Sequence, residues 1–134
     1  MTHDDLRKLV LIEASKNPGV RLFPNPVGMA TAGKMVKRFT QDGKSYALIE
    51  NPRQIKFGLA EGTSDLIGFK VENIGSIKIP RFLGVEIKVG ADRLRPEQKN
   101  WIEVVSGYGG IAGVVKDSVC NLKELLNTPM QYIY

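Results

Sequence analysis

Apolar and polar residues alternate along residues 82–90, FLGVEIKVG, with the two-residue period of a β-strand. One face of the expected strand carries four apolar side chains, Leu83, Val85, Ile87 and Val89. The other face places Glu86 beside Lys88, in a segment apolar enough for the middle of a sheet. A charged pair at such a position requires a partner, because burying an uncompensated charge is costly.

The same reading predicts an alternation of helices and strands along the chain. The first helix is expected from Thr2 to about Lys16, with Thr2 and Asp5 as a capping box and Asn17-Pro18-Gly19 as its stop. Strands are expected at residues 20–23, 65–69, 82–89 and 110–116, and further helices from Pro96 to about Tyr108 and over residues 118–127. No linker or repeat interrupts this order, so residues 1–134 are expected to form a single α/β domain.

Residues 28–57 are the least regular part of the pattern. Asp42-Gly43 stands there between two strand-like runs, which indicates a β-hairpin. Residues 34–57 hold six basic and two acidic side chains, a net charge of +4 out of +5 for the whole chain. Such a segment is either a solvated hairpin or a basic arm that grips phosphates.

Two helices also carry polar residues on apolar faces. Gln98 shares a face with three large side chains, Trp101, Ile102 and Val105. Glu13 has the same spacing relative to Leu6, Leu9 and Val10. An unpartnered buried polar group costs on the order of 1–3 kcal/mol, so these groups are expected to meet one another or an ion.

Asp65 supplies a second acid for such an ion site. If the strand that it opens pairs with residues 82–89, Asp65 and Glu86 approach each other across adjacent strands. Two carboxylates, the backbone carbonyl of Ile87 and waters suit Mg²⁺. Lys88 could then orient or deprotonate an attacking water, or offset charge that builds on a phosphorane-like transition state.

Composition narrows the remaining possibilities. Cys120 is the sole cysteine, which excludes an internal disulfide and fits a reducing cytoplasm, prokaryotic or phage-infected, with Cys120 as a packed thiol. His3, the sole histidine, is expected at the surface. No apolar run approaches the length of a membrane span. Trp101 and Tyr108 are expected to pack in the core or at a helix end, with base stacking as the alternative. The apolar tail 130–134 is expected to fold back on the core or to form a dimer contact.

The motifs GTSDLIGF, FLGVEIKVG and LRPEQKNW, followed by GGIAGVV at residues 109–115, occur in the order of a known family. With them the chain resembles the virus-type replication-repair nuclease domain, VRR-NUC, of the PD-(D/E)xK nuclease superfamily. The resemblance extends from the first helix to residue 115. It implies a restriction-endonuclease-like fold, a central mixed β-sheet flanked by helices, here with a basic β-hairpin insertion.

The resemblance also implies roles for individual residues. Asp65 and Glu86 would bind Mg²⁺ or Mn²⁺, Lys88 would assist catalysis, and Gln98 would support the site from its helix. Glu13 would be the first-helix acid that binds metal directly or through water. The carry-over to the second strand rests on Asn25 alone, because Phe23-Pro24 precede it where the family often has an arginine.

The substrate implied by the resemblance is branched double-stranded DNA. Standalone relatives work as homodimers on four-way junctions, and a flap or another branched DNA is the alternative. Residues expected to contact DNA are Asn25, Lys34, Lys37, Arg38, Arg93, Arg95 and Lys99. Two other classes stay open: a non-catalytic DNA-binding module that retains the fold, and a structural domain whose buried ion pair only fixes the fold.

Overall fold

The computed structural model describes residues 1–130, and residues 131–134 of the apolar tail lie outside the described part. The chain divides into two compact units. The first, the core unit, comprises residues 1–25 together with the chain from Ala60 onward; the second, the arm, is Pro26–Leu59. The organisation of residues 1–134 as a single domain stays a prediction.

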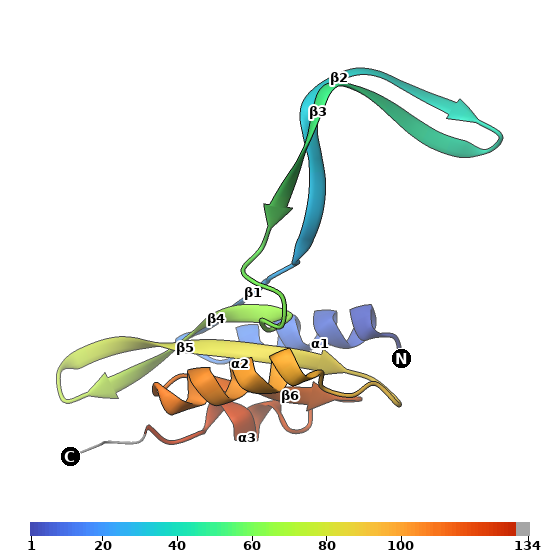
Figure 1. Ribbon diagram of the computed structural model, residues 1–134. Coiled ribbons are helices and arrows are strands. Elements are labelled where there is room, and N and C mark those ends of the chain that lie inside the picture. The colour runs from blue at the N-terminus through green and yellow to red at the C-terminus, as the bar shows by residue number, and fades with distance from the viewer. Residues whose placement is uncertain (131–134) are drawn as a thin grey trace. The chain divides into compact units, whose positions relative to one another are not determined.

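The core unit is a four-stranded sheet with three helices (Figure 1). Its elements are α1 (His3–Ser15), β1 (Val20–Pro24), β4 (Leu66–Ile74), β5 (Ile77–Lys88), α2 (Pro96–Gly107), β6 (Ile111–Lys116) and α3 (Leu122–Leu126). The strand order is β1-β4-β5-β6; the first three strands pair antiparallel, and β5 pairs parallel with β6. The predicted mixed sheet with helices is therefore confirmed.

Helix α1 begins as the sequence predicts. The Thr2 hydroxyl accepts a hydrogen bond from the Asp5 N–H at 3.1 Å, and the Asp5 carboxylate accepts one from the Thr2 N–H at 3.1 Å. These reciprocal bonds form a capping box, which satisfies two backbone donors that a helix start otherwise leaves unpaired. The capping box thereby fixes where the first turn of α1 starts.

Strand β5 is longer than its alternating segment suggests. It starts at Ile77 and forms a hairpin with β4, in which Val71 pairs with Pro80. β6 pairs with β5 only from Leu83 onward, so Pro80 lies where β5 has a neighbour on one side alone. A proline is tolerated there because its missing N–H removes no ladder bond on the paired side.

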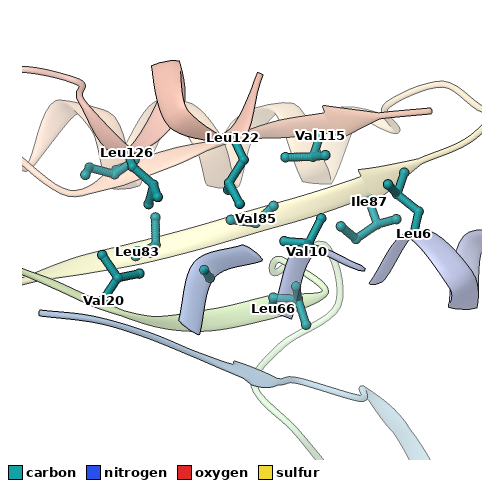
Figure 2. Close-up of a cluster of buried hydrophobic side chains, with 12 residues drawn as sticks. Leu6, Val10, Val20, Leu66, Leu83, Val85, Ile87, Val115, Leu122 and Leu126 are labelled. Carbon is teal, nitrogen blue, oxygen red and sulfur yellow. The ribbon is translucent and has the colours of Figure 1, made fainter. Parts of the chain in front are cut away.

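The core lies on one face of β5. Leu83, Val85 and Ile87 are fully buried, and they form one cluster with Leu6 and Val10 of α1. Helix α3 adds its two buried leucines to the same cluster (Figure 2). Glu86 and Lys88 follow the alternation onto the opposite face of β5. The apolar alternation read in the sequence thus decides which face of the sheet is core and which carries the polar pair.

The last helix differs from its prediction. Only Leu122–Leu126 is helical, and residues 117–121 form bends and turns. Asp117, directly after β6, has a φ of 62°, a left-handed conformation that neither a strand nor a right-handed helix contains. Cys120 lies in the turn and is exposed, so the expectation of a packed thiol is wrong.

The arm is a long two-stranded hairpin of β2 (Gly28–Gln41) and β3 (Lys44–Phe57). Asp42 and Gly43 both have positive φ, 51° and 73°, as in the type I′ turns that suit the twist of paired strands. The predicted hairpin turn is confirmed. The description of this segment as the least regular part of the chain is wrong, because the strands pair along nearly their whole length despite two bulges.

At Gly68, strands β1 and β4 approach too closely for a larger side chain. A Cβ at this position would lie 1.8 Å from the backbone oxygen of Arg21 in β1, whereas a Cβ on Gly107 at the end of α2 would have no neighbour within 4 Å. Gly68→Ala is therefore expected to lower the free energy of unfolding by about 1–3 kcal/mol. Gly107→Ala, the control, should be neutral or slightly stabilising. Equal urea midpoints for Gly68→Ala and the parent chain would contradict this packing.

Candidate active site

The candidate site begins with the loop that delivers Asp65 to the start of β4. The Asn25 N–H donates to the backbone oxygen of Asp65 at 2.8 Å. The Asn25 side-chain amide donates to the Ser64 oxygen at 2.9 Å and to Thr63 Oγ1 at 3.0 Å. Asn25 thus fastens the loop before β4 to the end of β1.

This arrangement corrects the prediction that Asn25 contacts DNA. Asn25 is only 6 % exposed, and both hydrogens of its amide nitrogen are directed into the loop. A side chain whose donors are used internally acts by positioning. Asn25 therefore holds the backbone of Asp65 in place.

Asp65 and Glu86 meet as the strand pairing predicts. The register pairs Leu66 with Val85, which brings the residue before Leu66 next to the residue after Val85. Oδ2 of Asp65 accepts a hydrogen bond from the Ile87 N–H at 2.8 Å. In an extended strand the N–H and C=O of one residue point to the same side. The Ile87 carbonyl therefore faces the edge at which Asp65 lies.

Glu86 is almost inaccessible, at 2 % exposure. Its Oε1 accepts a hydrogen bond from Gln98 Nε2 at 2.8 Å, and Gln98 Oε1 in turn accepts one from the Arg95 N–H at 2.9 Å at the start of α2. The second bond fixes which end of the Gln98 amide faces the acid. The helical spacing of residues 98–105 predicts that Gln98 points inward, and in the structure Gln98 contacts Glu86.

The other oxygen of Glu86 is unsatisfied. Glu86 Oε2 is buried and has no hydrogen-bond partner among residues 1–130. Burial, with the Asp65 carboxylate next to it, raises the pKa of Glu86 from 4.5 to about 8. Two facing carboxylates both accept hydrogen bonds and donate none when ionised, so this pair requires a shared proton or a cation.

Lys88 lies on the same face of β5 as Glu86, and its side chain is only 8 % exposed. Its Nζ is 3.3 Å from Oδ2 of Asp92, in the loop that follows the strand. The positive charge of Lys88 acts to lower the pKa of Glu86, against the larger effect of burial. A buried lysine on the same face as a buried acid is the polar pair that the alternation of β5 predicts.

A serine–tryptophan contact supports the loop from α2. Trp101 Nε1 donates to Ser64 Oγ at 2.8 Å, and the Trp101 ring packs edge-on against Phe82. A Cβ on Gly84 would lie 2.5 Å from Ser64 Oγ, so glycine leaves the space that this contact needs. The predicted packing of Trp101 is confirmed. Tyr108 is 92 % exposed, so its predicted packing is wrong.

Glu13 does not join the site. Its carboxylate pairs with Lys16 at 3.1 Å and its side chain is 43 % exposed. The contact of α1 with Asp65 comes from the other end of the helix, where His3 Nε2 lies 3.4 Å from Asp65 Oδ2. Ten residues of helix separate the two positions by about 15 Å. The apolar stripe of α1 instead runs through Leu6, Val10 and Ala14, which turns Glu13 aside.

His3 is thus a residue that sequence analysis missed. It was expected to be a plain surface residue, and its side chain is indeed 45 % exposed, but it contacts a site acid 62 positions away. The capping box contained the available signal, since it places His3 in the first turn of α1. Only the packing of α1 against the sheet brings that turn to Asp65.

The basic residues predicted to bind DNA lie in two places. Arg93, Arg95 and Lys99 are exposed on the loop after β5 and on α2. Arg95 is 3.5 Å from Glu97, and its charge also acts to lower the pKa of Glu86. Lys34, Lys37 and Arg38 are exposed on the arm. Their contacts with DNA stay predictions.

Within residues 1–130, no group of three His, Cys, Asp or Glu side chains is close enough to hold a metal ion alone. Asp65 and Glu86 would therefore need main-chain and water ligands to bind one. Mg²⁺ accepts such a set, since it is bound by one or two carboxylates and keeps several waters. The donor set and the unsatisfied Glu86 oxygen fit a hard divalent cation.

An acid pair with a lysine two residues after one acid, at the end of a central strand of a mixed sheet, is an arrangement typical of nucleases. Comparison with known families agrees, because residues 31–118 match the VRR-NUC domain. The chain therefore belongs to the VRR-NUC family of nuclease domains, which implies activity on DNA. The match includes Asp65, Glu86, Lys88 and Gln98 but starts after α1, so the resemblance read in the first helix lies outside it.

Searches among curated proteins and among solved structures found no match to the chain. No helix within residues 1–130 has the length and apolar character needed to cross a membrane.

The raised pKa of Glu86 predicts a pH dependence of stability. Between pH 4.5 and about 8 the folded chain holds a proton that the unfolded chain has lost. The free energy of unfolding should therefore fall as pH rises through this window, by at most about 1.4 kcal/mol per pH unit from this group. Glu86→Gln removes the titration, so its urea-unfolding free energy in EDTA should depend less on pH between 5 and 8. Identical pH slopes for the variant and the parent chain would contradict the assignment.

Proposed function

We propose that this nuclease is a Mg²⁺-dependent endodeoxyribonuclease that cuts branched DNA, with four-way junctions as its main substrate and Mn²⁺ as an alternative ion. The observation that carries the proposal is the buried Glu86 next to the half-buried Asp65, with one unsatisfied oxygen on Glu86 and with Lys88 on the same strand as Glu86. A restriction-endonuclease-like PD-(D/E)xK fold is part of the proposal, supported by the mixed sheet and the E-x-K spacing of residues 86–88.

A divalent cation would be held by Asp65, Glu86 Oε2 and the Ile87 carbonyl. When bound, it would supply a Lewis acid and lower the pKa of a coordinated water. The hydrogen bonds that already fix the two acids support this role: the Ile87 N–H and His3 contact Asp65, and Gln98 donates to Glu86. Glu13 has no part in this site, since it pairs with Lys16 elsewhere on α1.

The remaining residues act around these ligands. Gln98 orients Glu86 and directs its free oxygen away from the helix amide. Lys88 is positioned to hold or activate the attacking water, or to offset the charge that develops on the phosphate. Attack in line with the leaving 3′-oxygen leaves a 5′-phosphate and a 3′-hydroxyl. His3 lies beside Asp65 and can help to hold its carboxylate in place.

The proposed substrate and assembly follow from charge and symmetry. Six basic and two acidic side chains in residues 34–57 favour a polyanion, as do the exposed Arg93, Arg95 and Lys99. One site cuts one strand, whereas a four-way junction has two-fold symmetry that a homodimer would match. A flap or another branched DNA is the second candidate. Cleavage of matched four-way, flap and linear substrates, with sedimentation of the free protein and the complex, tests substrate and assembly together.

The role of Lys88 has a matched control on the neighbouring strand. Lys116 of β6 pairs in register with Lys88 but is exposed. Lys88→Ala should reduce the single-turnover rate of junction cleavage by at least about 100-fold, with DNA affinity within a few-fold of the parent chain. Lys116→Ala should leave the rate nearly unchanged. Retained cleavage by Lys88→Ala would remove the lysine from the mechanism, and binding without cleavage by the parent chain would favour a non-catalytic module.

Metal binding can be tested without measuring activity. Calorimetric titration with Mn²⁺ should give an affinity at least about tenfold weaker for Asp65→Asn or Glu86→Gln, because each substitution removes a carboxylate ligand. Glu13→Gln is the control and should stay within twofold of the parent chain, since its carboxylate pairs with Lys16. A loss of affinity in Glu13→Gln as large as that in Asp65→Asn would contradict the proposed ligand set.

A further inference from the structure

The arm exposes its side chains without building a core. Every residue in 26–59 is half-buried or exposed. The large apolar side chains exposed on its two strands are Met29, Met35, Val36, Phe39, Tyr46, Leu48, Ile55 and Phe57. A two-stranded hairpin is marginally stable by itself in water, and exposed apolar residues gathered on one element mark an interaction surface.

The strand register divides the outer arm into two different faces. Directly paired residues share a face, and successive residues alternate between faces. One face, here called the aromatic face, carries the pairs Lys37–Leu48, Phe39–Tyr46 and Gln41–Lys44. The opposite face carries Arg38–Ala47 and Thr40–Ser45. The apolar surface of the outer arm is thus concentrated with two lysines on one side.

The aromatic face has an ordered centre. The rings of Phe39 and Tyr46 stack with centroids 5.4 Å apart and planes 15° from parallel. Lys37 Nζ lies 5.8 Å from the centroid of Phe39. Both rings are well exposed, at 39 % and 45 %. Flat aromatic surface next to ammonium groups is the combination with which proteins bind bases and phosphates together.

Charge decides between DNA and a second copy of the arm as the occupant of this face. The net charge of +4 over residues 34–57 would oppose the approach of another arm. The same charge attracts a nucleic-acid backbone and releases its counterions. A solubilising role accounts for the lysines, but not for an exposed aromatic pair on the same face.

We infer that the aromatic face of the arm binds DNA where base faces are exposed, at a branch point, by stacking on Phe39 and Tyr46 while Lys37 and Lys44 contact phosphates. In an intact duplex each base face is covered by its neighbour, so an aromatic pair on a ribbon surface has nothing to stack on. At a branch the stack is interrupted, and less unstacking energy is needed. This inference rests on the proposed function and deepens it, because it assigns the preference for branched substrates to the arm.

Binding of the full-length chain to a four-way junction and to a linear duplex of the same arm sequences, in EDTA, tests the stacking. Tyr46→Leu should weaken junction binding about tenfold and change duplex binding less than twofold. Tyr46→Phe, the matched control, keeps the ring and should bind both DNAs as the parent chain does. Equal losses on junction and duplex, or no loss on either, would overturn the inference.

Lys37 and Arg38 are neighbours in the sequence but lie on opposite faces of the arm, so their substitution tests which face binds DNA. Lys37→Gln should reduce the slope of log affinity against log salt by about one. Arg38→Gln, on the opposite face, should reduce the slope by less than Lys37→Gln does. Equal reductions from both substitutions would mean that the arm grips phosphates without a preferred face.

A fluorescence measurement on the parent chain does not depend on whether the variants keep the structure of the arm. A 2-aminopurine base placed at the branch point of the junction should lose fluorescence when the parent chain binds. The decrease should be smaller when the Phe39→Leu variant binds. Unchanged fluorescence on binding, or an oligomer that Phe39→Leu dissociates without altering DNA affinity, would overturn the inference. Failure of the parent chain to bind any DNA would instead refute the proposed function. If the arm variants bind and cleave junctions as the parent chain does, only the role of the arm is refuted.

Discussion

The burial of Glu86 beside Asp65 is the constraint on which the site depends. Burial of Glu86, together with repulsion from the neighbouring Asp65 carboxylate, raises the pKa of Glu86. The surrounding structure holds them there all the same: Asn25 fixes the backbone of Asp65, the Ile87 N–H binds its carboxylate, and Gln98 binds Glu86. Several hydrogen bonds thus keep the two acids together, which supports the proposal that a cation binds between them.

The chain separates two tasks that a nuclease needs. The core unit supplies rigidity, because the site acids lie on a central strand and at the start of its neighbour, above a fully buried apolar cluster. The arm supplies accessible charged and aromatic surface on a ribbon without a core. Precise chemistry requires the rigidity of the core unit. Contact with a large substrate is easier for the accessible surface of the arm. The proposed activity and the inferred role of the arm are therefore carried by different parts of the molecule.

Much of the fold could be read from the sequence, and the reasons are local. The capping box of Thr2, the Asp42-Gly43 turn and the alternation of β5 each act over a few residues. The predictions that were wrong failed for local reasons and also because of contacts between distant parts of the chain. The last helix is shorter because residues 118–121 form bends and turns, and β5 is longer because its pairing with β4 begins at Ile77, before the apolar segment. Cys120 and Tyr108 were expected inside, and both lie at the surface.

The sequence by itself determined that Glu86 and Lys88 share a polar face of a central strand and that Gln98 points inward, because periodicity fixes the direction of side chains. Only the tertiary structure decided which distant groups meet them. It brought His3 instead of Glu13 to Asp65, and it turned Asn25 inward to hold the loop before Asp65. Periodicity gives a direction relative to one element, whereas these contacts depend on the axial position at which α1 and the loops pack on the sheet.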